Sequence, residues 1–479
     1  MNRKISFHPI TRIEGHAKVT IYIDSEGKVK NTLFQVIEYR GFERILRNRP
    51  IEEAPLIVSR ICGLCSPSHH LASVKTVDEI FKLEISEEDV TFKLRDLFHL
   101  AGILHSHLLH IFFLYLPDVL FEIKDVNSGF PKMLKYHMPL VKKVLEVRNF
   151  AKTLLEVLGG SSIHPSASVP GSFLNPMKPS QSSELLNVAM NSMRMLIDVV
   201  EMVEGKINEN MSIEEGINIH SNFVALYSNS IYPLYHAESI HAISASGELS
   251  SSFKCYDYYK KIFEESIPWS YAKSPYLKDL GFYRVGPLAR FNINKLNSEN
   301  SKDFVERFLS KIQKPILSSN YYNLIRIAES IYVLDRIIEL LNDEKITNTP
   351  VTHENLKIKR LEGIGVVEAP RGLLIHHYKV NGDGYIKDAN LIVATVQNIP
   401  VIEREIAIIS EKIISREGII EDKLYREISK VIRNYDPCLS CATHKYDFPY
   451  TMEIHIENRG KIITYPKTLN SNSLTLNII

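Results

Sequence analysis

The 479-residue sequence predicts an α-rich α+β fold, with a central bundle of long helices and small β elements near the N- and C-terminal ends. Apolar residues recur at helical spacing over several segments of about 20 residues or more. Alternating apolar and polar residues, typical of strands, occur close to both ends of the chain. No internal repeat, low-complexity tract or Pro/Gly/Ser-rich linker divides the sequence. These three observations favour one large domain.

The β elements come first and last in the chain. Residues 5–36 contain the alternating run KVTIYID, the turn SEGK and the run KVKNTLFQV, which together predict strands. The run TMEIHIENRGKIITY, after His444, is also typical of strands. Residues 373–395 predict a hairpin that turns at NGDG, because glycine and asparagine favour tight hairpin turns.

The helices lie between these elements. Helical spacing is found over residues 69–83, 87–115, 138–158, 184–208, 303–342 and 403–434. The stretch 97–121 is apolar enough to require a membrane test, but it contains four histidines and a Pro-Asp pair. A spanning helix needs about 20 residues with few ionisable groups. We therefore expect a buried core helix and no transmembrane segment.

The composition is that of a soluble globular protein, with 44% hydrophobic and 24% charged residues. A formal net charge of +1 gives no reason to expect a nucleic-acid partner. The N-terminus, MNRKISFHPITRIEG, lacks the apolar core of a signal peptide. We expect a cytoplasmic protein, and its five cysteines therefore do not indicate a disulfide framework.

Four of the five cysteines form two C-x-x-C pairs at opposite ends of the chain, in RICGLCSPSHH (60–70) and DPCLSCATH (436–444). Two such pairs can give one metal four thiolate ligands. Spacing alone leaves three alternatives open: a structural zinc site, an iron–sulfur cluster and a catalytic metal site. Pairs that bind structural zinc usually lie about 15–20 residues apart, far closer than here.

Three neighbouring features favour a catalytic site. Cys62 and Cys65 precede a predicted helix start, where the helix dipole stabilises thiolate. Glu14 is a lone carboxylate in TRIEGH, and Arg371 lies in the turn APRG. Taken singly, Glu14 is an ordinary surface glutamate and Arg371 an ordinary loop arginine.

Taken together, these motifs resemble the large, catalytic subunit of [NiFe] hydrogenases, over residues 7–463. The signature R-x-C-G-x-C-x-x-x-H is met at 60–69, and D-P-C-x-x-C-x-x-H at 436–444. TRIEGHAKVTI, EYRGFE, YRVGPLAR and EAPRG-x-L-x-HHY are similar to the family as well. These motifs are most similar to those of the cytoplasmic multisubunit group, which contains NAD(P)-linked enzymes, sulfhydrogenases and methanogen F420-non-reducing hydrogenases.

The resemblance implies a nickel–iron centre. Nickel would be held by Cys62, Cys65, Cys438 and Cys441, and the second cysteine of each pair would also bridge to an iron that carries CO and cyanide ligands. Such a centre catalyses the reversible heterolytic cleavage of H₂ to protons and electrons. The electrons would pass to an iron–sulfur small subunit, then to further electron-transfer subunits linked to NAD(P), sulfur or heterodisulfide reduction.

The resemblance also assigns roles around the centre. Cys438 is the expected base, because an arginine is normally always protonated, and Arg371 then acts as an electrostatic and positioning group. Glu14 resembles the family glutamate that takes the proton onward. Asp118 and Asp436 resemble the carboxylates that position the arginine.

Two further assignments concern the surroundings of the metals. His69 resembles the histidine that donates toward a bridging sulfur and so tunes the centre. A second metal, Mg²⁺ or Fe²⁺, is implied with Glu43, a backbone carbonyl near Leu391 and His444 as its protein ligands, and with water completing the shell.

The family pattern divides the chain into a hydrogenase domain, residues 1–444, and a C-terminal maturation extension, residues 445–479. A dedicated endopeptidase would remove the extension once nickel is in place, with a maturation chaperone as a further partner. The extension would keep Cys438 and Cys441 accessible until then. Two other functions stay open: a regulatory hydrogen sensor of the same fold, which turnover rate distinguishes, and a structural zinc protein, which metal content distinguishes.

Overall fold

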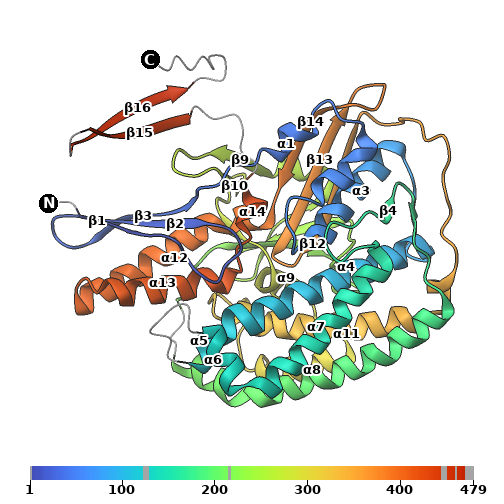
Figure 1. Ribbon diagram of the computed structural model, residues 1–479, viewed down its shortest axis with the longest axis horizontal. Coiled ribbons are helices and arrows are strands. Elements are labelled where there is room, and N and C mark those ends of the chain that lie inside the picture. Colours follow the sequence, from blue (N-terminus) through green and yellow to red (C-terminus); the bar gives the residue numbers. More distant parts are fainter. Residues whose placement is uncertain (1–2, 122–128, 214–216, 444–449, 459–460, 470–479) are drawn as a thin grey trace.

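Four long helices pack against one another along one side of the molecule (Figure 1). They are α4 (Val90–Leu109), α7 (Met138–Gly159), α8 (Pro179–Ile213) and α11 (Tyr321–Asn342). The computed structural model describes residues 3–121, 129–213, 217–443, 450–458 and 461–469. This bundle, combined with several small sheets, confirms the predicted α-rich α+β fold class.

The remaining helices are shorter or lie on the sheets. They are α1 (Phe42–Leu46), η1 (Ile51–Glu53), α2 (Ala54–Val58), α3 (Ser66–Phe81), the π-helical η2 (His110–Tyr115), α5 (Leu116–Leu120), α6 (Gly129–Tyr136), η4 (Cys255–Lys260), α9 (Pro287–Ile293), α10 (Glu299–Phe308), η5 (Glu344–Thr347), α12 (Ala394–Glu417), α13 (Glu421–Tyr435) and α14 (Leu439–Ala442).

The strands form small sheets. In chain order they are β1 (Arg3–Phe7), β2 (Ala17–Ile23), β3 (Val29–Val36), β4 (Ser168–Val169), β5 (Ser172–Phe173), β6 (Asn222–Tyr227), β7 (Ser239–Ile243), β8 (Leu249–Lys254), β9 (Ile262–Ser266), β10 (Lys273–Leu277), β11 (Tyr283–Arg284), β12 (Glu362–Ala369), β13 (Gly372–Val380), β14 (Ile386–Ile392), β15 (Tyr450–Asn458) and β16 (Lys461–Leu469). The N-terminal sheet β1-β2-β3 is antiparallel and packs on α12. The hairpin predicted at 373–395 is β13-β14, extended to three strands by β12.

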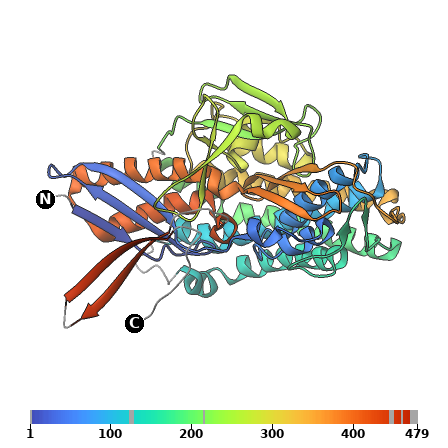
Figure 2. The ribbon, with the colours of Figure 1, turned by 90° about the horizontal axis from the view of Figure 1, so that it is seen from above.

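Three regions differ from the sequence-based expectation. Residues 303–342 form two helices, α10 and α11, because a loop that contains Pro315 interrupts them. Residues 403–434 are also two helices, separated at Gly418, which has a positive φ of 76°. The sheet β11-β6-β7-β8 in the middle of the chain was not expected; Figure 2 shows it in yellow-green, on the opposite side from α7.

The helix tested for membrane insertion belongs to the bundle. The continuous helical stretch Val90–Leu120 is long and apolar enough to cross a membrane, but 78% of its most apolar window is buried inside the protein. Its histidines have partners within the fold; for example, His107 Nε2 lies 2.9 Å from a carboxylate oxygen of Glu329 on α11. Burial and internal pairing are typical of a core helix.

The tail hairpin β15-β16 stands clear of the helical body in both views (Figures 1 and 2). Its strands pair antiparallel with one another from Tyr450↔Leu469 to Asn458↔Lys461. This confirms the strands that the sequence predicts after His444.

A half-buried carboxylate on α12 predicts a pH-dependent change in the environment of the chain's single tryptophan. Glu403 Oε1 accepts hydrogen bonds from the Phe34 backbone N–H (2.8 Å) and from Trp269 Nε1 (3.1 Å). Burial raises the pKa of Glu403 to about 7. Because the folded state holds this proton more tightly than the unfolded state, stability falls as pH rises from about 4.5 to about 7, by up to roughly 3 kcal/mol.

We expect tryptophan fluorescence to titrate with a midpoint near 7, and Glu403→Gln to abolish that transition. Glu411→Gln is the matched control, because Glu411 on the same helix also accepts a β3 backbone N–H, that of Val29. A transition that persists in Glu403→Gln would show that another group is responsible.

Candidate metal centre

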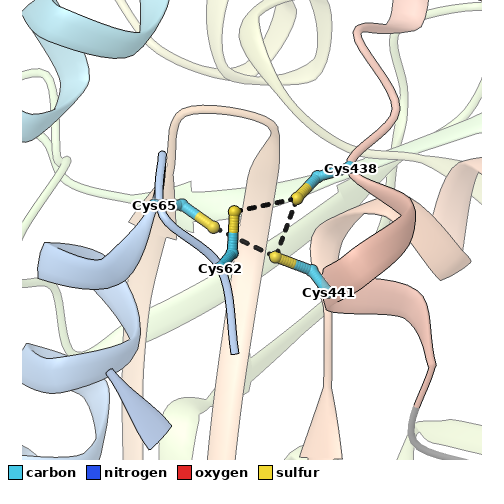
Figure 3. Close-up of side chains that lie close together, drawn as sticks. All are labelled: Cys62, Cys65, Cys438 and Cys441. Carbon is cyan, nitrogen blue, oxygen red and sulfur yellow. Dashed lines mark hydrogen bonds between the residues drawn. The ribbon is translucent and has the colours of Figure 1, made fainter. Parts of the chain in front are cut away.

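The two C-x-x-C pairs converge on one buried point (Figure 3). The sulfur atoms of Cys62, Cys65, Cys438 and Cys441 all lie within 4.8 Å of one another, and none of these cysteines forms a disulfide. Cys62 Sγ lies 3.3 Å from Cys438 Sγ, and Cys65 Sγ lies 3.1 Å from Cys441 Sγ. Four convergent sulfur donors fit a soft or borderline metal ion.

Each pair is placed by the start of a helix. Cys65 is the N-cap of α3, and Pro67 occupies the first turn, where its missing N–H costs nothing. Cys438 is the N-cap of the short helix α14. Asp436 ends α13 in the left-handed conformation, with φ of 52°, and so turns the chain toward the cysteines.

The pKa values of the cysteine thiols are shifted in opposite directions. The hydrogen bond from Cys438 lowers the pKa of Cys62 well below its ordinary value. Burial raises the pKa of Cys438 and of Cys441 well above it. Because thiolates are the metal ligands, metal binding here must release protons.

Glu14 touches the centre directly. Its Oε2 accepts hydrogen bonds from Cys438 Sγ (3.1 Å) and from the Ser440 N–H (3.0 Å), and the Ser440 hydroxyl donates to Oε1. The backbone is tied as well, since Leu439 N–H donates to the Glu14 carbonyl at 3.0 Å. Gly15 allows this approach, because a Cβ there would lie 2.9 Å from Leu439 Cβ, at a φ of +79°.

Arg371 is buried and lines the cavity beside the cysteines. Its Nε donates to the Asp436 carbonyl at 2.6 Å and its Nη2 to Asp436 Oδ1 at 3.1 Å, while Nη1 lies 3.4 Å from Ser106 Oγ. Burial alone would lower the pKa of Arg371, but Asp436 and the cysteine sulfurs hold it well above its ordinary value. The guanidinium is therefore a fixed positive charge.

The turn that bears Arg371 is held by a buried arginine. Arg290 donates to the backbone carbonyls of Ala369 (3.0 Å) and Pro370 (3.3 Å), which immediately precede Arg371. It is neutralised by Glu329 (2.7 Å) and Glu368 (2.9 Å). Arg290, the last residue of the YRVGPLAR motif, thus holds the backbone of the APRG motif in place.

His69 begins a chain of polar groups that leads away from the sulfurs. His69 Nε2 lies 3.4 Å from Cys441 Sγ, and its Nδ1 lies 3.1 Å from His376 Nε2. His376 Nδ1 in turn lies 2.7 Å from Tyr378 Oη, which reaches Ser73 Oγ at 3.0 Å. Burial lowers the pKa of His69 to about 4, so the ring is neutral and can donate to only one side.

Close packing of α3 on the sheet makes this chain possible. Gly365 on β12 faces α3, and a Cβ there would lie 2.0 Å from the Ala72 carbonyl oxygen. His69, Ser73 and Thr76 face the sheet from α3, while His376 and Tyr378 lie on one face of β13.

Asp118 does not position Arg371 as the resemblance implied. Its Oδ1 pairs with Arg12, and its Oδ2 accepts from Arg433 Nε at 2.7 Å. His110 takes the place beside Asp436 instead, with its Nδ1 2.9 Å from Asp436 Oδ1. A π-helical segment, His110–Tyr115, begins at His110 and lies between α4 and the short helix α5 that bears Asp118.

The implied second metal site holds an ammonium group that the sequence analysis missed. Glu43 Oε1 accepts from Lys273 Nζ and from the Leu391 N–H, both at 2.8 Å. Leu391 therefore contacts Glu43 through its backbone N–H. An N–H group is a hydrogen-bond donor and cannot act as a metal ligand. Burial raises the pKa of Glu43 to about 7. His444 lies outside the described residues, although the neighbouring Thr443 carbonyl accepts from the Gly41 N–H beside α1.

A small cavity adjoins three of the four cysteines, Cys65, Cys438 and Cys441. It has a volume of about 10 Å³, room for roughly one water-sized molecule. Its walls are partly apolar and partly polar; besides cysteine and His69, they include Ala369, Pro370, Arg371, Leu374, Val393, Ala394 and Thr395. A centre built here would have space beside it for a very small molecule.

Several residues of the site could not be found from their own motifs. His110 was expected to be a packing histidine, Lys273 stood in no recognised motif, and Arg290 stood in the recognised motif YRVGPLAR without an assigned role. His376 lies in the HHY run, where the period of two along a strand could have indicated one shared face for His376 and Tyr378. The polar partners of His110, Lys273 and Arg290 lie on elements that are distant in the sequence.

Models of known protein families match the segments of the chain that contain these residues. A model of the nickel-dependent hydrogenase family matches residues 40–126 and 202–444, and a HoxL-like model matches residues 4–39. The chain is 35% identical to one subunit of the vhc F420-non-reducing hydrogenase of Methanococcus voltae, over 96% of this chain and 99% of that one. It is 32% identical to the beta subunit of the NAD-reducing hydrogenase HoxS of Cupriavidus necator, over 93% and 95%.

The fold is shared with solved structures. A chain of an NAD⁺-reducing [NiFe]-hydrogenase in the H₂-reduced state superposes with a TM-score of 0.85 at 32% identity, over 92% of this chain and 99% of that chain. A Ni-Fe-Se hydrogenase from D. vulgaris Hildenborough superposes with a TM-score of 0.72 at 23% identity, over 93% and 100%.

Proposed function

The chain belongs to the nickel-dependent hydrogenase family, and on that premise we propose that it is the catalytic subunit of a [NiFe] hydrogenase. It interconverts dihydrogen with protons and electrons. The observation that carries this proposal is the convergence of four buried sulfurs, with a carboxylate in contact with one of them and a fixed guanidinium lining the cavity beside them. A closed zinc site would need neither group, nor the cavity beside the sulfurs.

The four thiolates would hold nickel, and Cys65 and Cys441 would bridge to iron. When bound, the metal pair supplies the Lewis acidity at which dihydrogen is split heterolytically. His69 donates toward Cys441 and so lowers the charge density on that sulfur. The surrounding fold keeps bulk water away, since all four cysteines are buried.

The proton leaves the centre through Cys438 and Glu14. Cys438 Sγ takes the proton, and Glu14 Oε2, which lies 3.1 Å away, receives it. Ser440 holds the Glu14 carboxylate in place through its N–H and its hydroxyl. Glu14 is half-buried and so connects the buried thiol to the protein surface.

Arg371 acts as an electrostatic and positioning group, oriented by Asp436. Its raised pKa keeps it protonated, so it is a poor base and a good stabiliser of negative charge. The iron would carry CO and cyanide ligands. Apolar cavity walls such as Leu374 suit CO, while the N–H groups of Arg371 and the hydroxyl of Thr395 offer hydrogen bonds to cyanide nitrogen.

The second metal would be Mg²⁺ (or Fe²⁺), with Glu43, a backbone carbonyl near Leu391 and His444 as ligands. The surroundings fit a hard cation, because the oxygens of Glu264 and Asn390 also face this point. The buried Glu264 Oε1 has no partner among the described residues.

The protein would work in a complex. Relatives are named as subunits, among them the alpha chain of sulfhydrogenase 2 of Pyrococcus furiosus. Electrons would leave through an iron–sulfur small subunit, and further electron-transfer subunits would link it to NAD(P), sulfur or heterodisulfide reduction in the cytoplasm. Residues 445–479 would be a maturation extension that an endopeptidase removes with the help of a chaperone; the match to the family ends at residue 444, which supports this.

Infrared spectroscopy on the complex purified anaerobically from its native host tests the assignment. We expect CO and cyanide stretching bands from a chain that mass spectrometry shows to be cut after residue 444. Cys441→Ser should lose these bands. The control Cys255→Ser should keep them, because Cys255 is not part of the four-cysteine cluster and its thiol donates to the Ala237 carbonyl. A fully processed chain without such bands would contradict the proposal.

A further inference from the structure

A row of buried hydrogen-bonding groups begins at Cys441 and passes between α3 and β13. His69 Nε2 lies 3.4 Å from Cys441 Sγ, and His69 Nδ1 lies 3.1 Å from His376 Nε2. His376 Nδ1 lies 2.7 Å from Tyr378 Oη, which lies 3.0 Å from Ser73 Oγ. None of these five residues is more than 1% exposed, so bulk water does not replace a partner that one of them loses.

The sulfur end of the row fixes the tautomer of His69. A cysteine that binds a metal does so as the thiolate, which can accept a hydrogen bond but has no proton to donate. His69 is neutral, because burial lowers its pKa to about 4, so the ring carries one N–H. That N–H must be at Nε2, which faces Cys441, and Nδ1 is left as an acceptor.

His376 supplies the donor that this acceptor needs. Its Nε2 faces His69 Nδ1, so a proton on Nε2 completes the contact, and in the neutral ring Nδ1 then accepts. The Tyr378 hydroxyl faces that nitrogen and can donate to it, while the Ser73 hydroxyl can rotate to donate to Tyr378. Every N–H and O–H in the row then points toward Cys441.

The opposite tautomer of His69 is the alternative that His376 excludes. It would carry its proton on Nδ1 and would face the sulfur with the lone pair of Nε2, so the hydrogen bond to Cys441 would be lost. A proton on Nδ1 would also meet the N–H of His376, which places two donors 3.1 Å apart. Because α3 and β13 hold the two rings against each other, with centroids 5.3 Å apart, His376 can enforce this choice.

We propose that His376 is a positioning residue of the metal centre, which donates from its Nε2 to His69 Nδ1 and thereby keeps the His69 Nε2–H directed at Cys441. Tyr378 orients His376 in turn. This rests on the proposed function, in which Cys441 is a thiolate that bridges nickel and iron. A thiolate that accepts a hydrogen bond gives less charge to the metals, so the row tunes the electron density of the iron without touching it.

The test is infrared spectroscopy of the complex purified anaerobically from its native host, with the variants produced in that host. His376→Leu should move the CO and cyanide bands to lower wavenumber, because a sulfur with a weaker hydrogen bond leaves more electron density on iron and so weakens the bonds within its ligands. His376→Gln should leave the bands closer to their parent positions, since its NH₂ group can donate to His69 and its carbonyl oxygen can accept from Tyr378.

Two further variants complete the test. His70→Leu is the matched control and should leave the bands in place, because His70 is equally buried on α3 but its ring contacts the Pro55 carbonyl and the Ser168 N–H. Tyr378→Phe keeps the packing and removes the donor to His376 Nδ1. It should shift the bands in the same direction by a smaller amount, so the test does not depend on assembly of the centre in His376→Leu.

Two results would overturn the proposal. Bands at the parent positions in both His376→Leu and Tyr378→Phe would show that His69 keeps its tautomer without His376. Equal shifts in His376→Leu and His376→Gln would make His376 a packing residue. In either case the bands themselves are present, so a failure here is distinguishable from a failure of the hydrogenase assignment, which would remove the bands from the parent protein as well.

Discussion

Replacing Arg371 by lysine is expected to lower kcat for hydrogen oxidation by about 10²–10³-fold, with nickel content retained. The guanidinium makes two hydrogen bonds to Asp436, one to its carbonyl and one to its carboxylate, and a longer contact to Ser106. Lysine keeps the charge but has a single ammonium group, which cannot reproduce this planar set of contacts. The charge therefore moves away from the point at which the cavity meets the sulfurs.

Lysine is the informative replacement because it separates catalysis from folding. A neutral residue would leave Asp436 buried without its main counter-charge, which costs about 3–5 kcal/mol. Arg95→Lys is the matched control, since Arg95 is also buried, pairs with Asp78 at 2.5 Å and donates to the Val169 carbonyl. Both variants should lose stability, but only Arg371→Lys should lose activity per nickel. Equal activity per nickel in the two variants would exclude a role for Arg371 in the reaction.

Each cysteine pair could be recognised from the sequence because the geometry within a pair is local. A C-x-x-C pair at a helix start brings its two thiols together whatever the rest of the chain does, as Cys65 at the N-cap of α3 illustrates. Long apolar periodicity likewise predicted the bundle helices α7 and α11. The meeting of the two pairs, 376 residues apart, is a long-range contact that only the resemblance to a known family indicated.

Partners that depend on register or on several elements could not be predicted. Asp118 pairs with Arg12 and Arg433, which come from the N-terminal segment and from α13, and nothing in the sequence around Asp118 indicates these partners. Lys273 lies in a five-residue strand, and nothing in that strand shows that three other elements supply its oxygen partners. Strands such as β6 are buried along most of their length, so they lack the alternation by which strands are recognised.

Replacing Glu14 by glutamine is the second change with a large expected effect, a fall in kcat of about 10²–10⁴-fold, because transfer of the proton from Cys438 loses its acceptor. Glutamine has the same shape, and its carbonyl oxygen can still accept the Ser440 N–H, while its NH₂ group can donate to the Ser440 hydroxyl. The amide cannot take up a proton, so the change removes the chemistry and leaves the packing around Gly15 intact.

Infrared spectra distinguish this loss from failed assembly. Glu14→Gln should show the same CO and cyanide bands as the parent protein, while turnover is lost. Glu52→Gln, at an exposed glutamate, should change neither. Turnover within twofold of the parent would mean that protons leave the thiol by another route. If the bands are lost together with turnover, Glu14 is needed to build the centre, and its 3.1 Å contact with Cys438 holds the thiol in place for metal binding.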